Sequence, residues 1–244
     1  MYLFLFQIRC FIYIYTLRVE ELNLIWLTGD KHGQITPFSE NLKYKKIKKN
    51  DTLIVCGDFG FLWNKSKQEI KNLKWLTKRK YAIAFVDGSN DNYDIISEYP
   101  IEDWNGGKIR RISKTIVYLM RGELYDIENT KVLSFGGSFN DNNSNEETYC
   151  LENAYPTKQQ INNVINNIKK VNGEIDLIVT HEAPNSIKSC LCNNEDEHNT
   201  FTNILEEIRV HSNFKKWFFG KYHIDKIIPP KYYAVFEDLI KLEK

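Results

Sequence analysis

Four short cassettes that combine Gly or Thr with Asp or His occur along the chain in a fixed order. They are Gly29-Asp30-Lys31-His32-Gly33, Gly57-Asp58-Phe59-Gly60, Thr180-His181-Glu182 and Gly220-Lys221-Tyr222-His223. Most of them directly follow a β-branched or aromatic run that is typical of a strand. Carboxylate and imidazole groups at strand ends allow a fold to gather metal ligands from distant parts of its sequence. The cassettes therefore predict a metal site.

The spacing within the first two cassettes supports that prediction. Asp30 and His32 lie two residues apart after a predicted strand, so both side chains can reach one ion in extended geometry. Asp58 repeats the arrangement after the next predicted strand, and the carboxyl ends of neighbouring parallel strands are where ligands bind. Together with His181 and His223, these three residues form a mixed set of oxygen and nitrogen ligands. Such a set suits Mn, Fe or Zn rather than Ca. Taken alone, a Gly-Asp pair after a strand is usually a turn and a lone histidine is usually structural, so the prediction depends on the combined order.

Composition sets mild limits on the class of protein. The 244 residues suffice for one large α/β domain or two small ones. The net charge of +1 gives no reason to expect nucleic acid or an anionic membrane as a partner. Five cysteines without CxxC spacing predict reduced thiols in a cytoplasmic protein. Cys190 and Cys192 could bind a soft metal, although free loop thiols are the simpler interpretation.

The first 22 residues differ from the rest. Met1–Tyr15 is almost wholly apolar and aromatic, apart from Gln7 and Arg9. It lacks the positive start and the small-residue cleavage site of a signal peptide, and it is shorter than a spanning helix needs. We expect residues 1–22 to be an apolar, mis-started or loosely packed extension and residues 23–244 to form the domain. A weak membrane anchor is the alternative for the extension.

The remaining sequence alternates strand and helix patterns. The predicted strands of the first part are residues 22–28, 52–56 and 81–86. Helices at about 38–49 and 66–79 separate them, which predicts a βαβαβ opening. Short β-rich runs predict an antiparallel meander at residues 108–112, 115–120, 123–126 and 132–135. The later part predicts two helices and four strands of a second sheet, at residues 157–171, 175–179, 200–211, 217–219, 224–228 and 232–236.

Taken together, the ordered motifs resemble those of the calcineurin-like metallophosphoesterases, and most closely their small bacterial branch. The resemblance covers about residues 23–240 and includes further matching segments. These are Val86-Asp87-Gly88, Trp104-Asn105-Gly106-Gly107-Lys108, Leu119-Met120-Arg121-Gly122, Phe135-Gly136-Gly137-Ser138 and Trp217-Phe218-Phe219-Gly220. It implies an α/β fold, a four-layer αββα sandwich of two mixed sheets, with a two-metal site that hydrolyses phosphate esters.

The resemblance also implies which residues bind metal. The ligands of the first metal match Asp30, His32, Asp58 and His223, and all four are present. The second metal shares Asp58 and uses His181. It also needs the Asn of a Gly-Asn-His-[Glu/Asp] cassette and the first His of a Gly-His-x-His cassette.

Both of these last two motifs are altered in this chain. Ser89 stands where the Asn ligand is expected, Asn90 where the catalytic His is expected, and Lys221 replaces the first His. Asn90 can donate a hydrogen bond but cannot deliver a proton at neutral pH, and general acid–base help is typically worth about 10²–10⁴-fold. An alternative register makes Asn90 the ligand and places Asp91 in the His position.

Lys221 is the sharper change, because an ammonium group has no lone pair for a metal and repels a second cation. It could partly replace that cation by pairing with Asp58 and a substrate phosphate. Glu182, beside His181, could orient a ligand or belong only to its loop. Arg121 could bind phosphate, although a sheet-surface charge is the commoner role.

These residues predict a cytoplasmic, metal-dependent phosphoesterase that hydrolyses a phosphate mono- or diester of a small molecule. Asn90 and Lys221 are its predicted catalytic residues, and Ser89 and Lys221 its predicted substrate-binding residues. One divalent transition metal (Mn, Fe or Zn) is firmly expected, and a second is doubtful. The alternative is a catalytically inactive relative that binds a phosphate ligand or a partner protein. Substrate identity and oligomeric state are left open by the sequence.

Overall fold

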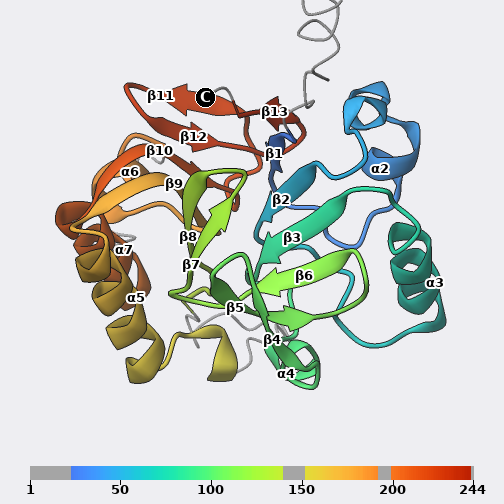
Figure 1. The fold of residues 1–244 in the computed structure, drawn as a ribbon, viewed down its shortest axis with the longest axis horizontal. Coiled ribbons are helices and arrows are strands. Elements are labelled where there is room, and N and C mark those ends of the chain that lie inside the picture. The colour runs from blue at the N-terminus through green and yellow to red at the C-terminus, as the bar shows by residue number, and fades with distance from the viewer. Residues whose placement is uncertain (1–22, 140–151, 192–198, 243–244) are drawn as a thin grey trace, which may run out of the picture.

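Two mixed β-sheets packed face to face form the frame of the protein, and helices cover the outer face of each (Figure 1). The computed structural model describes residues 23–139, 152–191 and 199–242. The first sheet has the strand order β13-β1-β2-β3-β6-β5-β4, and the second has the order β11-β12-β10-β9-β8-β7. Both contain parallel and antiparallel pairs, so the predicted αββα sandwich of two mixed sheets is confirmed.

The first sheet is built around parallel strands. Its strands are β1 (Ile25–Thr28), β2 (Thr52–Cys56), β3 (Ala82–Val86), β4 (Ile101–Trp104), β5 (Gly107–Arg111), β6 (Ile116–Leu119) and β13 (Ile240–Lys241). The helices that accompany it are α2 (Thr36–Glu40), η1 (Leu42–Lys46), α3 (Lys67–Leu76) and α4 (Tyr93–Ser97). β1, β2 and β3 are parallel neighbours in this order, which confirms the predicted βαβαβ opening.

The second sheet takes most of its strands from the later half of the chain. They are β7 (Leu124–Ile127), β8 (Thr130–Phe135), β9 (Glu174–Thr180), β10 (Asn213–Phe219), β11 (Lys226–Ile228) and β12 (Tyr232–Ala234). Its helices are η2 (Glu152–Ala154), α5 (Lys158–Lys170), α6 (Asn185–Lys188) and α7 (Thr200–His211). A Thr157 capping box begins α5, and a similar box at Asn199 begins α7.

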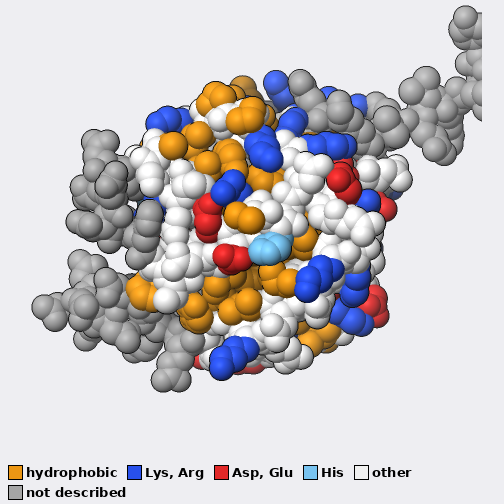
Figure 2. Space-filling model, turned by 90° about the vertical axis from the view of Figure 1, so that its left-hand side faces the viewer, with side chains coloured by type: hydrophobic (Ala, Val, Ile, Leu, Met, Phe, Trp, Pro, Cys, Tyr) orange, Lys and Arg blue, Asp and Glu red, His pale blue; other side chains and the backbone are white. Residues whose placement is uncertain are grey.

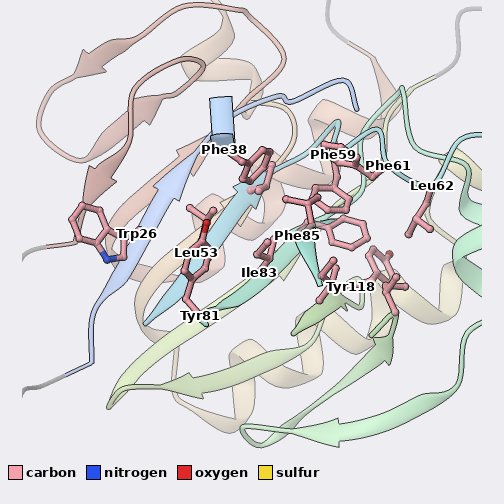
Figure 3. Packing of buried hydrophobic residues seen from close by; sticks show 14 of the residues in the cluster. Trp26, Phe38, Leu53, Phe59, Phe61, Leu62, Tyr81, Ile83, Phe85 and Tyr118 are labelled. Carbon is pink, nitrogen blue, oxygen red and sulfur yellow. The ribbon is translucent and has the colours of Figure 1, made fainter. Parts of the chain in front are cut away.

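Alternation along the buried strands creates three hydrophobic cores. In β2, Leu53 and Val55 face the helices of the first sheet, whereas Ile54 and Cys56 face the second sheet. Because side chains alternate along a strand, one sheet supplies both cores. Figure 3 shows the outer core of the first sheet, and a third core lies between the second sheet and its helices.

The helix predicted at residues 38–49 is wrong in length and type. The segment forms the short helix α2, a break at Asn41 with extended backbone, and the 3₁₀ helix η1. The three-residue period of a 3₁₀ helix places Tyr44 and Ile47 on the buried side. Leu42, in contrast, is 69% exposed.

The meander predicted between residues 108 and 135 is divided between the two sheets. β5 pairs with β6 in the first sheet, and β7 pairs with β8 in the second. The chain crosses from one sheet to the other at Met120–Glu123, where Gly122 has a positive φ of 82°. Periodicity identified the strands but not this crossing. It also missed the short elements α4, β4, η2, α6 and β13.

The surface has a mixed character on the side of α7. Figure 2 shows this face, where hydrophobic side chains lie between interspersed basic and acidic ones. Within the part of the chain that the structure describes, no helix is both long and apolar enough to span a bilayer. The predicted extension at 1–22 and residues 140–151, 192–198 and 243–244 lie outside the described residues.

Candidate metal centre

The predicted ligands converge because they follow strands whose carboxyl ends lie on the same side of the sandwich. Asp30 follows β1 and Asp58 follows β2, and these two strands are parallel neighbours. His181 follows β9, and the segment with His223 follows β10, which is parallel to β9. The two sheets therefore contribute to one cluster, as expected for the ends of parallel strands.

Three buried residues form the tightest group. Among the described residues, Asp30, Asp58 and His181 each offer a ligand atom within 4.8 Å of the others. The His181 Nδ1 atom lies 3.4 Å from Oδ1 of Asp30, and Nε2 lies 3.5 Å from Oδ1 of Asp58. The Nδ1 atom is buried and lacks the alignment of a hydrogen bond. Two buried carboxylates beside a buried imidazole suit a divalent cation.

The other two predicted histidines meet beside this group. The Nε2 atoms of His32 and His223 are 3.0 Å apart, and the His32 Nδ1 atom is 3.8 Å from Oδ2 of Asp58. Two nitrogen ligands about 2.1 Å from one ion, at a right angle to each other, have about this separation. All five predicted ligands thus lie in one connected cluster, although the tightest group contains His181 rather than His32 and His223.

The cluster is electrostatically coupled. Burial alone would raise the pKa of Asp58, but His181, the two hydrogen bonds from Asn90, and His32 lower it. Burial alone would lower the pKa of His181, but Asp58 and Asp30 outweigh burial and raise it to about 9. The two carboxylates therefore attract positive charge strongly, as a metal site must.

The loops that carry these residues hold unusual backbone conformations. His32, Asp58, Lys221 and His223 have positive φ angles of 45°, 45°, 68° and 49°. Such conformations cost non-Gly residues about 1–3 kcal/mol each and gather at functional sites. The Asp58 carbonyl accepts hydrogen bonds from the amides of Lys31 and His32, which locks the first loop onto the second.

Two glycines are required by close packing at the cluster. A Cβ atom on Gly57 would lie 2.1 Å from the His181 Nδ1 atom, and one on Gly88 would lie 2.2 Å from Oδ1 of Asp58. Both distances are far below van der Waals contact, so any larger residue would displace a candidate ligand.

The altered segment Gly88-Ser89-Asn90-Asp91 lies directly against Asp58. The Ser89 hydroxyl is 3.4 Å from both Oδ2 of Asp58 and Nε2 of His181. The backbone and side-chain amides of Asn90 each donate to Asp58 at 2.7 Å. Both residues reach Asp58 because they lie in a turn after β3, where strand alternation does not apply.

The alternative register is not supported for Asp91. Its buried carboxylate accepts hydrogen bonds from the amides of Phe59, Gly60 and Gly88. It therefore holds the Gly57-Asp58-Phe59-Gly60 cassette against the segment that begins at Gly88, and it does not take the position of the catalytic His. Ser89 lies between Asp58 and His181, with its hydroxyl 3.4 Å from each.

Lys221 forms an ion pair that differs from the one expected. Its Nζ atom donates to Oε2 of Glu182 at 2.8 Å, instead of pairing with Asp58. Its backbone amide donates to both carboxylate oxygens of Asp30, at 3.1 and 2.9 Å. Glu182 is fully buried and also accepts from the Nζ atom of Lys188 at 3.2 Å. One carboxylate and two ammonium groups therefore lie beside His181.

Two roles could not be read from the sequence. Glu182 is the buried carboxylate that pairs with Lys221. The one sequence signal for this ion pair is the unusual Lys in the last cassette. Arg121 is 2% exposed and not a sheet-surface charge. It forms an ion pair with Asp87, whose carboxylate also accepts from the Tyr118 hydroxyl at 2.9 Å. Cys56 is buried and Cys190 is exposed, and both are free thiols.

A family model and solved structures are similar to this chain. No curated protein matches the chain in a sequence comparison. The crystal structure of a phosphopantetheinyl hydrolase from Mycobacterium tuberculosis is similar at 15% sequence identity and a TM-score of 0.41. The match covers 89% of this chain and 91% of that one. The family model for calcineurin-like phosphoesterases matches residues 24–227, which is most of the chain. The chain therefore belongs to the calcineurin-like phosphoesterase family, which is metal-dependent.

Proposed function

We propose that this protein hydrolyses a phosphate mono- or diester with one divalent transition metal ion. The observation that supports this most directly is the buried cluster of Asp30, Asp58 and His181, with the His32–His223 pair beside it, in a member of this family. We propose Asp30, His32, Asp58 and His223 as ligands of Mn, Fe or Zn, with His181 next to them. Such an ion supplies a Lewis acid for the phosphoryl oxygen and lowers the pKa of a bound water.

The residues around a second ion position do not fit a second ion. The Ser89 hydroxyl stands where the family pattern has an amide oxygen. Lys221 brings an ammonium group, which has no lone pair for a metal and is paired with Glu182. The positive charge of Lys221 repels a second cation at this position and attracts an anion.

The chain's own residues then have separate roles. We propose that Lys221, held by Glu182, and Ser89 bind the phosphoryl group. Lys acts as a point charge in other phosphate sites, and a hydroxyl donates one hydrogen bond. Asn90 donates to Asp58 and keeps that carboxylate ionised and oriented. Its side chain also lines a cavity beside His32, so we propose that it orients the ester there.

The test combines metal content with hydrolysis. The protein is loaded with Mn²⁺, and its activity is measured on 4-nitrophenyl phosphate and bis(4-nitrophenyl) phosphate. We expect about one ion per chain. Because the metal contribution is worth several kcal/mol, Asp58→Asn should reduce kcat/KM by about 100-fold or more. Asp126→Asn, the same change at an exposed position on β7, should leave both measurements unchanged. About two ions per chain would contradict the single-ion proposal.

The same assay separates an enzyme from an inactive relative. If the protein is inactive, hydrolysis stays at background with Mn²⁺, Fe²⁺ and Zn²⁺. In that case, the triple variant Ser89→Asn, Asn90→His and Lys221→His should gain activity, because it restores the residues that both altered motifs lack.

A further inference from the structure

Two cavities flank His32, and its side chain belongs to the lining of both. One, of about 390 Å³, lies between the β1–α2 loop and Phe236. The other, of about 300 Å³, lies between the same loop and the segment from Gly60 to Asn72, and Asn90 lines it too. Both volumes fall within the range of about 300–1,000 Å³ that is usual for small-molecule sites. A group bound at His32 could therefore extend into space on two sides.

The larger cavity, here called the Phe236 cavity, combines apolar walls with acidic groups. Pro37 and Phe236 supply the apolar surface, and the Phe236 ring stacks on His223 at 4.8 Å between centroids. Glu40 and Glu237 line it and are exposed. The buried Lys31 is its only lining Lys or Arg among the described residues, and its Nζ atom donates to the Phe236 carbonyl at 2.7 Å.

The smaller cavity, here called the Trp63 cavity, is polar and uncharged for the most part. Trp63 supplies its aromatic wall, and Gln68 and Asn72 supply amides. Glu69 also lines it, but its carboxylate accepts from the backbone amides of Trp63 and Asn64 at 2.9 and 3.0 Å. No Lys or Arg is among the described residues that line this cavity. Neither cavity therefore offers a free cation to a second phosphate or carboxylate.

On these grounds we propose that the substrate is a phosphodiester whose two organic arms occupy the Phe236 cavity and the Trp63 cavity. The arm in the Phe236 cavity is neutral or cationic, because Glu40 and Glu237 repel an anion there and an aromatic face favours a cation. This rests on the proposed phosphoesterase function and deepens it. Water forms the new P–O bond, one ester P–O bond breaks, and its alcohol leaves with a proton from that water. The other arm remains as a phosphate monoester.

Filling each cavity in turn tests the two-arm arrangement. Gln34→Trp places a bulky ring in the Phe236 cavity, and Gln68→Trp places one in the Trp63 cavity. Gln159→Trp on α5 is the matched control, because Gln159 is exposed and lines neither cavity. A diester needs both cavities, so each filling should lower kcat/KM for bis(4-nitrophenyl) phosphate by about 10-fold or more. The monoester 4-nitrophenyl phosphate has one arm, so at most one filling should affect it.

The charge of the arm is tested with 4-nitrophenyl phosphorylcholine, a diester with a quaternary ammonium arm. In the double variant Glu40→Gln and Glu237→Gln, its KM should rise by about 2-fold to 30-fold, the range for two exposed ion pairs. The KM of bis(4-nitrophenyl) phosphate should stay within about twofold of the parent value, since its arms are neutral. An equal change for both esters would overturn the charge part of the proposal.

The outcomes separate this inference from the proposed function. Hydrolysis of the monoester without a diester loss in both Trp variants would keep the function and overturn the two-arm arrangement. Hydrolysis of neither ester would overturn the function. The inference is then tested by calorimetric titration of the Mn²⁺-loaded protein with the intact esters. Weaker diester binding in both Trp variants would support it, and unchanged binding would overturn it.

Discussion

The ion pair between Glu182 and Lys221 allows a stringent test of the altered site. Glu182→Gln keeps the shape of the side chain and removes the charge. The change leaves the ammonium groups of Lys188 and Lys221 without the carboxylate that they share at 3.2 and 2.8 Å. Removal of one partner from a fully buried ion pair costs roughly 3–5 kcal/mol.

The structure sets the expected size of the effect. The Glu182 side chain is 0% exposed and that of Lys188 is 7% exposed, which favours a large loss. The Lys221 side chain is 31% exposed, so water can compensate part of its loss. We therefore expect the free energy of unfolding to fall by about 2–4 kcal/mol. For a chain of this size, Tm should fall by about 4–16 °C.

Thermal unfolding and urea titration, with and without Mn²⁺, measure this loss. The control is Glu207→Gln on α7, where the side chain is 67% exposed and pairs with His211 at the surface; Tm should change little. A double-mutant cycle with Lys221→Met then isolates the pair, and a coupling energy of about 1 kcal/mol or more is expected. If Glu182→Gln shifts Tm no more than the control does, the pair does not stabilise the site and our reasoning is wrong.

Further predictions concern the frame around the site. Leu53→Ala in β2 should cost about 2–5 kcal/mol in urea unfolding, because it opens a cavity in a fully buried position, whereas Leu42→Ala at an exposed position should cost far less. A loss at Leu42 as large as that at Leu53 would contradict the 3₁₀ geometry of η1. Burial raises the pKa of Tyr81 to about 12, above its usual value of 10. Its stabilising contribution is therefore complete below pH 10 and is lost as the pH rises to about 12, an effect of up to about 2–3 kcal/mol. Tyr81→Phe should flatten the fall of unfolding free energy between those pH values, and an unchanged slope would exclude the assignment.

The positions of the site residues could be predicted because they depend on local rules. Asp30, Asp58 and His181 each follow a strand that the sequence identifies by its apolar run, and parallel strands bring their carboxyl ends together. The glycines at 57 and 88 match positions where a Cβ atom would overlap a ligand. These features need no knowledge of long-range packing.

The partners of these residues could not be predicted, because they come from contacts across the fold. Asn90 reaches Asp58 through a turn, which strand alternation does not describe. Lys221 reaches Glu182 because β9 and β10 are parallel neighbours, a pairing that hydrophobic periodicity alone does not specify. The division of the meander between two sheets could not be predicted for the same reason. β6 and β7 are adjacent in sequence but belong to different sheets, and only contacts across the fold decide this.

The origin of the candidate ligands in both sheets has a consequence for how the protein unfolds. His32 and His223 are 191 positions apart in sequence, and they come from loops of different sheets. An ion held by both would act as a removable cross-link between the two halves of the sandwich. At a free concentration 100 times its dissociation constant, it would add about 2.7 kcal/mol to the folded state. Removal of the ion by a chelator should then weaken the contact between the two sheets before either sheet unfolds. In the metal-free protein, proteolytic cleavage should therefore begin where the two sheets meet.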